Sequence, residues 1–127
     1  MIPNAATFDR LALSAIAGLP RTFRELVADV VVRIEEFADT ETLDDLDIDD
    51  PLELTGLYHG RPLSEESVWS TGELPPMIRL FRQPLLAEWR ETGVALKDLV
   101  HHVVIHEIGH HFGLSDEEMA AIEDSAD

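Results

Sequence analysis

The 127-residue sequence contains no cysteine, which excludes disulfides, Cys-ligated zinc, iron–sulfur clusters and thiol nucleophiles. Basic residues are scarce, because 9 Lys and Arg stand against 26 Asp and Glu and give a formal net charge of −17. Such a surface repels phosphate backbones, so we expect no nucleic-acid partner. No apolar run approaches the roughly 18 residues that span a bilayer, so we expect no membrane insertion and, with the lack of cysteine, a cytoplasmic protein. The length fits one domain over residues 1–127.

Hydrophobic periodicity predicts a helix followed by strands. From Thr7 to Gly18, apolar residues recur at three- and four-residue steps, which predicts an amphipathic helix. Alternation from Val30 to Phe37 predicts a half-buried strand. Further strands are expected at Leu52 to His59 and at Met77 to Arg82, and the prolines around them favour edge positions. The polar stretch from Arg61 to Gly72 predicts a connecting loop.

The segment from Asp39 to Asp50 is strongly acidic. Its spacing of aspartates resembles a calcium loop, but Asp50 stands where Gly is required and Gly56 stands where a bidentate Glu is required. Mutual repulsion of the carboxylates therefore predicts an extended, solvated loop. The seven carboxylates are Asp39, Glu41, Asp44, Asp45, Asp47, Asp49 and Asp50.

Histidines gather on the most strongly predicted helix, from Leu96 to Phe112. Two of them, His106 and His110, lie one helical turn apart, so their imidazoles can converge on one ion at roughly 2.0–2.1 Å per bond, which suits zinc. Glu107 is rotated by about 100° from His106 and is placed to act as a general base on a water at the metal. Five of the six histidines lie on this helix: His101, His102, His106, His110 and His111.

A third ligand is expected just beyond the helix. Gly113 can adopt the left-handed conformation that ends a helix, and the turn back would bring Asp116 to the metal at about 2.0–2.2 Å. Asp116 has a second interpretation, because Ser115 and Glu118 form a capping box around it and an acid in the first turn of a helix is favourable anyway. The two interpretations are compatible, since a capped helix start can fix a ligand. A fourth position remains for water.

The pattern His106-Glu-Ile-Gly-His110-His-Phe-Gly113-Leu-Ser-Asp116 resembles the zincin metallopeptidases, and the chain is similar to the small bacterial zincin-like metallopeptidase family. The supporting segments are Leu54-Thr-Gly-Leu-Tyr58-His-Gly60, Leu74-Pro-Pro-Met-Ile-Arg-Leu80 and Val104-Ile-His-Glu-Ile-Gly-His-His-Phe-Gly-Leu114. The resemblance implies an α+β, zincin-like fold with an N-terminal helix, a small twisted mixed sheet of about three or four strands, a metal-binding helix and a short C-terminal helix. It also implies zinc at His106, His110 and Asp116, with Glu107 as the base. No Met-turn is expected, because Met119 falls in the predicted last helix.

Several other residues carry two interpretations each. His102 is either a donor to the metal ligands or an exposed histidine, and Tyr58 is either a packing residue or a donor to an oxyanion. Arg79 and Arg82 are expected to form salt bridges on this acidic surface, the alternative being contacts to substrate carboxylates. Trp89 is expected to pack.

The sequence thus predicts a zinc-dependent peptidase that acts on a peptide or protein substrate, with Glu107 moving the proton. We expect the substrate to lie antiparallel along the Met77 to Arg82 strand. The alternative is a non-catalytic metal-binding or partner-binding module on the same fold. The substrate, the native metal and the oligomeric state are left open.

Overall fold

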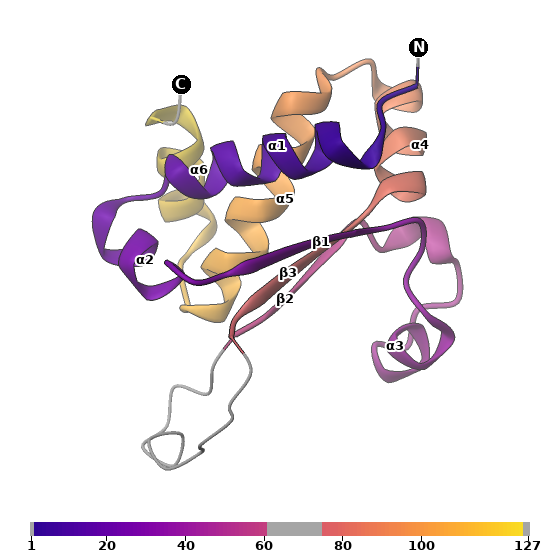
Figure 1. Ribbon diagram of the computed structural model, residues 1–127, viewed down its shortest axis with the longest axis horizontal. Coiled ribbons are helices and arrows are strands. Elements are labelled where there is room, and N and C mark those ends of the chain that lie inside the picture. Colours follow the sequence, from indigo (N-terminus) through magenta and orange to yellow (C-terminus); the bar gives the residue numbers. More distant parts are fainter. Residues whose placement is uncertain (1, 61–74, 126–127) are drawn as a thin grey trace.

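A small mixed sheet lies at the centre of the fold in the computed structural model, which describes residues 2–60 and 75–125 (Figure 1). It contains β1 (Val31–Glu35), β2 (Gly56–His59) and β3 (Met77–Phe81), in the order β1-β3-β2. β1 runs parallel to β3, whereas β2 runs antiparallel to it. The α+β class and the three-stranded sheet confirm the fold predicted from the sequence.

Alternation along the strands separates the two faces of the sheet. Ile78 and Leu80 of β3 are fully buried against the helices, and Val32 and Ile34 of β1 pack on the same core. Arg79 lies between Ile78 and Leu80, so it projects to the opposite face. The half-buried alternation predicted for β1 is therefore confirmed.

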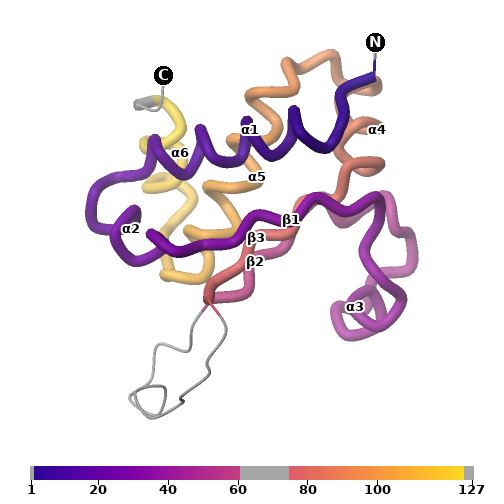
Figure 2. Tube along the Cα trace, viewed as in Figure 1, coloured from indigo at the N-terminus to yellow at the C-terminus, as the bar shows by residue number. Residues whose placement is uncertain are grey.

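Helices α1 (Ala5–Ala17), α5 (Leu96–His111) and α6 (Asp116–Ser125) build the other side of this core. α1 begins at Asn4, whose side chain accepts a hydrogen bond from the Thr7 amide. It packs on α5 and β1, while α5 packs on β2 and α6. α6 runs back alongside α5 (Figures 1 and 2). The predicted N-terminal helix, the predicted helix that carries five histidines and the predicted C-terminal helix are all present.

Two further helices, α2 (Arg21–Leu26) and α4 (Arg82–Thr92), were not predicted from the sequence. α4 buries Leu85 and Leu86 and ends at Gly93, which has a positive φ of 73°. Trp89 of α4 packs partly buried against the core, as predicted. Arg82 is therefore the first residue of a helix and not the last residue of a strand.

The prediction that β3 lies at an edge is wrong, because β3 pairs on both sides. Its prolines flank the strand and never interrupt it. The Pro76 carbonyl accepts a hydrogen bond from Val31, and Pro84 lies in the first turn of α4, where a missing N–H costs nothing. β2 is an edge strand, but it is shorter than predicted, because Pro51–Glu53 forms a 3-10 turn, η1.

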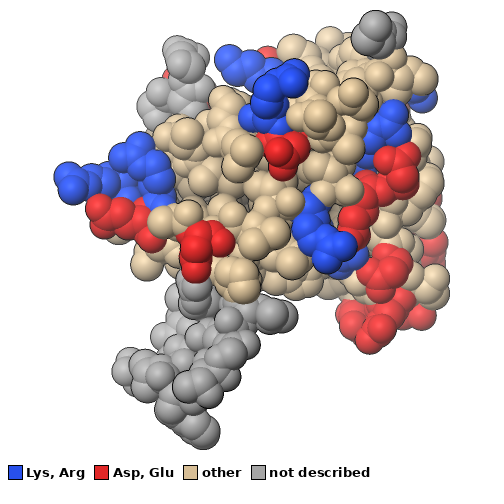
Figure 3. Space-filling view, viewed as in Figure 1, with Lys and Arg blue, Asp and Glu red and all other residues tan. Residues whose placement is uncertain are grey.

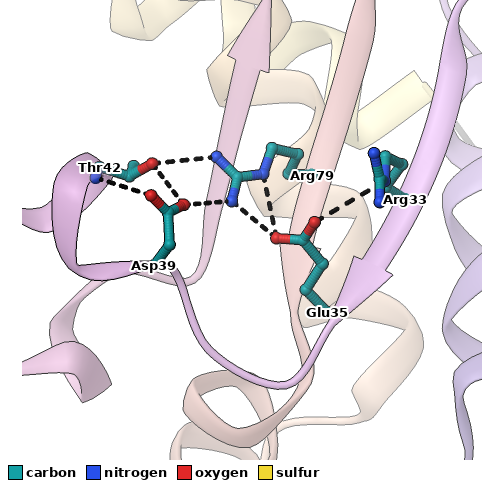
Figure 4. Close-up of polar contacts among 5 residues, drawn as sticks. All are labelled: Arg33, Glu35, Asp39, Thr42 and Arg79. Carbon is teal, nitrogen blue, oxygen red and sulfur yellow. Dashed lines mark hydrogen bonds and ion pairs between the residues drawn. The ribbon is translucent and has the colours of Figure 1, made fainter.

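The acidic segment is also not an extended loop, because it holds helix α3 (Thr40–Asp45). Asp39 caps this helix through Thr42 and also contacts Arg79 Nη2 at 2.8 Å, and the same Nη2 lies 2.7 Å from Glu35 (Figure 4). Leu43 is buried beneath the helix. Carboxylates gather at the α3 end of the molecule (Figure 3). The guanidinium of Arg79 and the burial of Leu43 offset the repulsion between these carboxylates.

The salt bridges predicted for Arg79 and Arg82 are present, with Arg82 lying 2.7 Å from Glu36. None of the helices in the described ranges combines the length and the hydropathy needed to cross a bilayer. The loop predicted from Arg61 to Gly72 lies outside the described residues.

Candidate metal centre

The candidate centre is built on one face of α5. Positions 102, 106 and 110 follow one another at four-residue steps, so they form a stripe along the helix. The apolar residues of α5, which include Val104 and Ile108, are buried and fix the rotation of the helix. The rings of His106 and His110 lie 5.9 Å apart between centroids and are perpendicular. His106 is half-buried and His110 is exposed.

A sharp corner follows α5, and its hydrogen bonds define it as a Schellman motif. The Leu114 amide donates to the Gly109 carbonyl at 2.9 Å, and the Gly113 amide donates to the His110 carbonyl at 3.1 Å. Gly113 has a φ of 74°, which L-residues with a side chain rarely adopt. The predicted left-handed stop is therefore present, and it turns the chain back toward the histidines.

The predicted capping box begins α6 at this corner. The Ser115 hydroxyl accepts from the Glu118 amide at 3.1 Å, and Glu118 accepts from the Ser115 amide at 3.0 Å. These hydrogen bonds lower the pKa of the Glu118 carboxyl. Asp116 is the first residue of the helix that they fix, and its carboxylate is left exposed.

The corner brings one donor atom each of His106, His110 and Asp116 within 4.8 Å of one another. Neighbouring ligands around a tetrahedral zinc lie about 3.3–3.5 Å apart, so a small closure would complete a three-ligand shell. Two imidazoles and a carboxylate match the donors of catalytic zinc sites, which keep a fourth position for water. These residues therefore fit the metal that the sequence predicted.

Glu107 lies beside this set, under β2. Burial raises the pKa of its carboxyl, while the charge of His110 and a hydrogen bond from the Tyr58 backbone amide act in the opposite direction. β2 approaches α5 closely at Gly56, where a Cβ would lie only 2.5 Å from Cγ1 of Val103. Because Gly56 has no side chain, β2 can pack closely on α5 and cover the carboxyl group of Glu107.

Tyr58 and His111 contact each other beside the acid, with ring centroids 5.0 Å apart. The Tyr58 side chain also packs against the core, which agrees with the packing interpretation. Gly109, in the middle of the motif, is required by packing, because a Cβ there would lie 2.6 Å from Sδ of Met119. Met119 lies in α6, the last helix, as the sequence predicted, and it is fully buried there.

A second set of donors, which the sequence analysis missed, overlaps the first. Glu123 of α6 places Oε1 2.7 Å from Nε2 of His106 and 3.0 Å from Nδ1 of His102. The three residues have donor atoms within 4.8 Å of one another. Two signals were available: His102 lies four residues before His106, and Glu123 lies seven residues after Asp116, which puts both acids on one face of α6.

A sequence model described as zincin-like metallopeptidase matches residues 27–126 of the chain. The match includes the sheet, α5, the corner and all of α6. A search of curated protein sequences gives no significant match.

Proposed function

This chain belongs to the zincin-like metallopeptidase family, and we propose that it is a zinc-dependent peptidase whose ion is held by His106, His110 and Asp116. The observation that carries the proposal is the convergence of these three donors, within 4.8 Å, at a corner formed by local sequence. The family supports zinc and a peptide or protein substrate.

Glu107 is the group that we propose moves the proton. A zinc ion in the three-residue set would supply Lewis acidity and a water made acidic near neutral pH. Glu107 follows His106 in sequence, and its carboxylate is partly buried beneath β2. From there it takes the proton of the attacking water and returns it to the nitrogen of the leaving amine.

The substrate is proposed to lie along β2, because the predicted position along the Met77 to Arg82 strand is occupied on both sides by other strands. Within residues 2–60 and 75–125, β2 pairs with β3 on one side and with no strand on the other, and we infer that an extended peptide adds along this second edge. The Tyr58 backbone also contacts Glu107, so this edge lies next to the proposed base. Main-chain hydrogen bonds would then hold the scissile bond near the ion.

Glu107→Gln tests the assignment. This variant should bind one zinc equivalent as the parent does, yet lose at least about a hundredfold in peptide hydrolysis, because it keeps the shape of the side chain and removes its basicity. His106→Ala should lose both zinc and hydrolysis. Cleavage by Glu107→Gln at the parent rate would refute the base, and zinc binding without cleavage of any peptide in a library would favour a non-catalytic module.

A further inference from the structure

Two stripes of potential ligands face each other between α5 and α6. His102, His106 and His110 follow one face of α5, and Asp116 and Glu123 follow one face of α6. α6 runs back along α5 (Figure 1), and the donors of the two helices come together as a ladder. Asp116 lies near His106 and His110, and Glu123 lies near His102 and His106. His106 belongs to both sets.

Glu123 places one carboxylate oxygen close to ring nitrogens of both His102 and His106. Its Oε1 is shielded from solvent and lies within 3.0 Å of two ring nitrogens, yet neither contact has the direction of a hydrogen bond. The rings of His102 and His106 lie 3.9 Å apart between centroids, with their planes tilted by 32°, and one nitrogen of each ring is near the same oxygen.

We propose that His102, His106 and Glu123 form a second position for a late first-row divalent ion such as Zn²⁺ or Co²⁺. Two imidazoles and a carboxylate suit these ions. The distances of 2.7 and 3.0 Å must open by about 0.3–0.8 Å to reach the roughly 3.3–3.5 Å between zinc ligands. The larger opening is between His106 and Glu123, and the Glu123 side chain, which is 27% exposed, is the flexible one of that pair.

The two positions exclude each other. A neutral imidazole has one nitrogen with a free lone pair, so His106 can serve one ion at a time. An ion bound with His102 and Glu123 leaves His110 and Asp116 without metal, and this second position is therefore a holding position for an inactive form. The inference rests on the proposed centre only through the shared His106.

Metal titrations of five variants, one of them Glu123→Gln alone, test the proposal without any assay of activity. His110→Ala/Asp116→Ala removes only the first position, His102→Ala/Glu123→Gln removes only the second, and His106→Ala removes both. Zn²⁺ is titrated against a chromophoric chelator, and Co²⁺ is followed by its visible absorption. His111→Ala is the control, since it removes a histidine of α5 that belongs to neither set.

We expect one equivalent of metal in the parent, in His111→Ala and in each double variant. His110→Ala/Asp116→Ala should bind Zn²⁺ at least about tenfold more tightly than His106→Ala, given that even a hydrogen-bonding partner of a ligand is worth 10–100-fold in metal affinity. The Co²⁺ spectra of the two double variants should differ, because the ion lies among different ligands. Both substituted residues of the first variant are exposed, and circular dichroism verifies its fold.

Zinc binding by His110→Ala/Asp116→Ala that is no tighter than binding by His106→Ala would overturn the second position. Two equivalents in the parent would overturn the exclusion. A loss of 10–100-fold in zinc affinity for Glu123→Gln alone would show instead that Glu123 only orients His106 for the first position. Failure of the proposed peptidase activity would appear separately, as metal binding without Glu107-dependent cleavage.

Discussion

Gly56 is the point where β2 presses on α5, and Gly56→Ala should destabilise the fold. A Cβ at this position would lie 2.5 Å from Val103 Cγ1, and 3.2 Å from Leu80 Cδ2. The first distance is about 1 Å shorter than a carbon–carbon contact at its optimum of roughly 3.5–4.0 Å, so the strand or the valine must move. Overpacking of this kind costs about 1–3 kcal/mol. Replacing glycine restricts the unfolded chain and returns about 0.4–1 kcal/mol, which leaves a net loss of about 1–2 kcal/mol.

A double-mutant cycle with Val103→Ala isolates the contact. Val103→Ala removes the methyl group that a new Cβ would strike, at a cost of about 1–2 kcal/mol for the lost burial. In that background Gly56→Ala should cost less than about 0.5 kcal/mol, which gives a coupling of about 1–2 kcal/mol. Urea unfolding of the four proteins, followed with a chelator present so that metal does not contribute, supplies the free energies. Additive effects within about 0.5 kcal/mol would refute the close contact between β2 and α5.

Three further predictions concern the corner and the α3 end. Gly113→Ala should lower the free energy of unfolding by about 1–2 kcal/mol, and Gly113→Asn by less, because nothing lies within 4 Å of a Cβ at 113 and the cost is the positive φ alone; equal losses in denaturant unfolding would contradict this. Ser115→Ala should lose about 1 kcal/mol of stability and keep its zinc affinity. Asp116→Ala should change metal-free stability by less than about 0.5 kcal/mol, and in the His102→Ala/Glu123→Gln background, where only the first position is left, it should lose zinc affinity; unchanged zinc affinity in that background would reduce Asp116 to a helix-start acid. Hydrogen bonds from the Thr42 hydroxyl and from Arg79 hold the pKa of Asp39 well below its ordinary 3.8, so its charge stabilises the fold above that pH and this contribution is lost as the pH falls toward the folded pKa. Asp39→Asn, which keeps a capping side chain, should therefore lower the melting temperature at pH 7, and the gap to the parent should narrow at pH 3; a gap that is unchanged at pH 3 would contradict the charge assignment.

Elements whose determinants lie within a few residues of each other were predictable from the sequence. The stop of α5 needs only Gly113, and the start of α6 needs only Ser115 and Glu118, so the corner follows from a short stretch of chain. The periodicity of α5 likewise places His106 and His110 on one face. This is why the donors expected to hold the metal were named before their geometry was known.

Features that depend on partners far away in the sequence were missed. The repulsion within the acidic segment was visible, but Arg79 lies 40 residues from Asp39, and no local pattern pairs them. The central position of β3 depends equally on which strands lie beside it, and flanking prolines carry no information about that. Both errors came from treating a local signal as if it described the whole environment of the segment.

Inside the candidate site, Asp116 and Glu123 of α6 show the same difference between a position set by local sequence and a position set by distant partners. Asp116 is placed by the backbone of the corner, which fixes it within three residues of Gly113. Glu123 lies two turns farther on, and it reaches His106 because the buried side chains of α6, Met119 and Ile122, hold this helix on the core beside α5. The spacing along α5 and α6 could have indicated His102 and Glu123, but the packing of the two helices decides which face of α6 meets α5. The donors at the corner were therefore predictable from local sequence, whereas the contact of Glu123 with His106, on which the proposed second metal position depends, needed the fold.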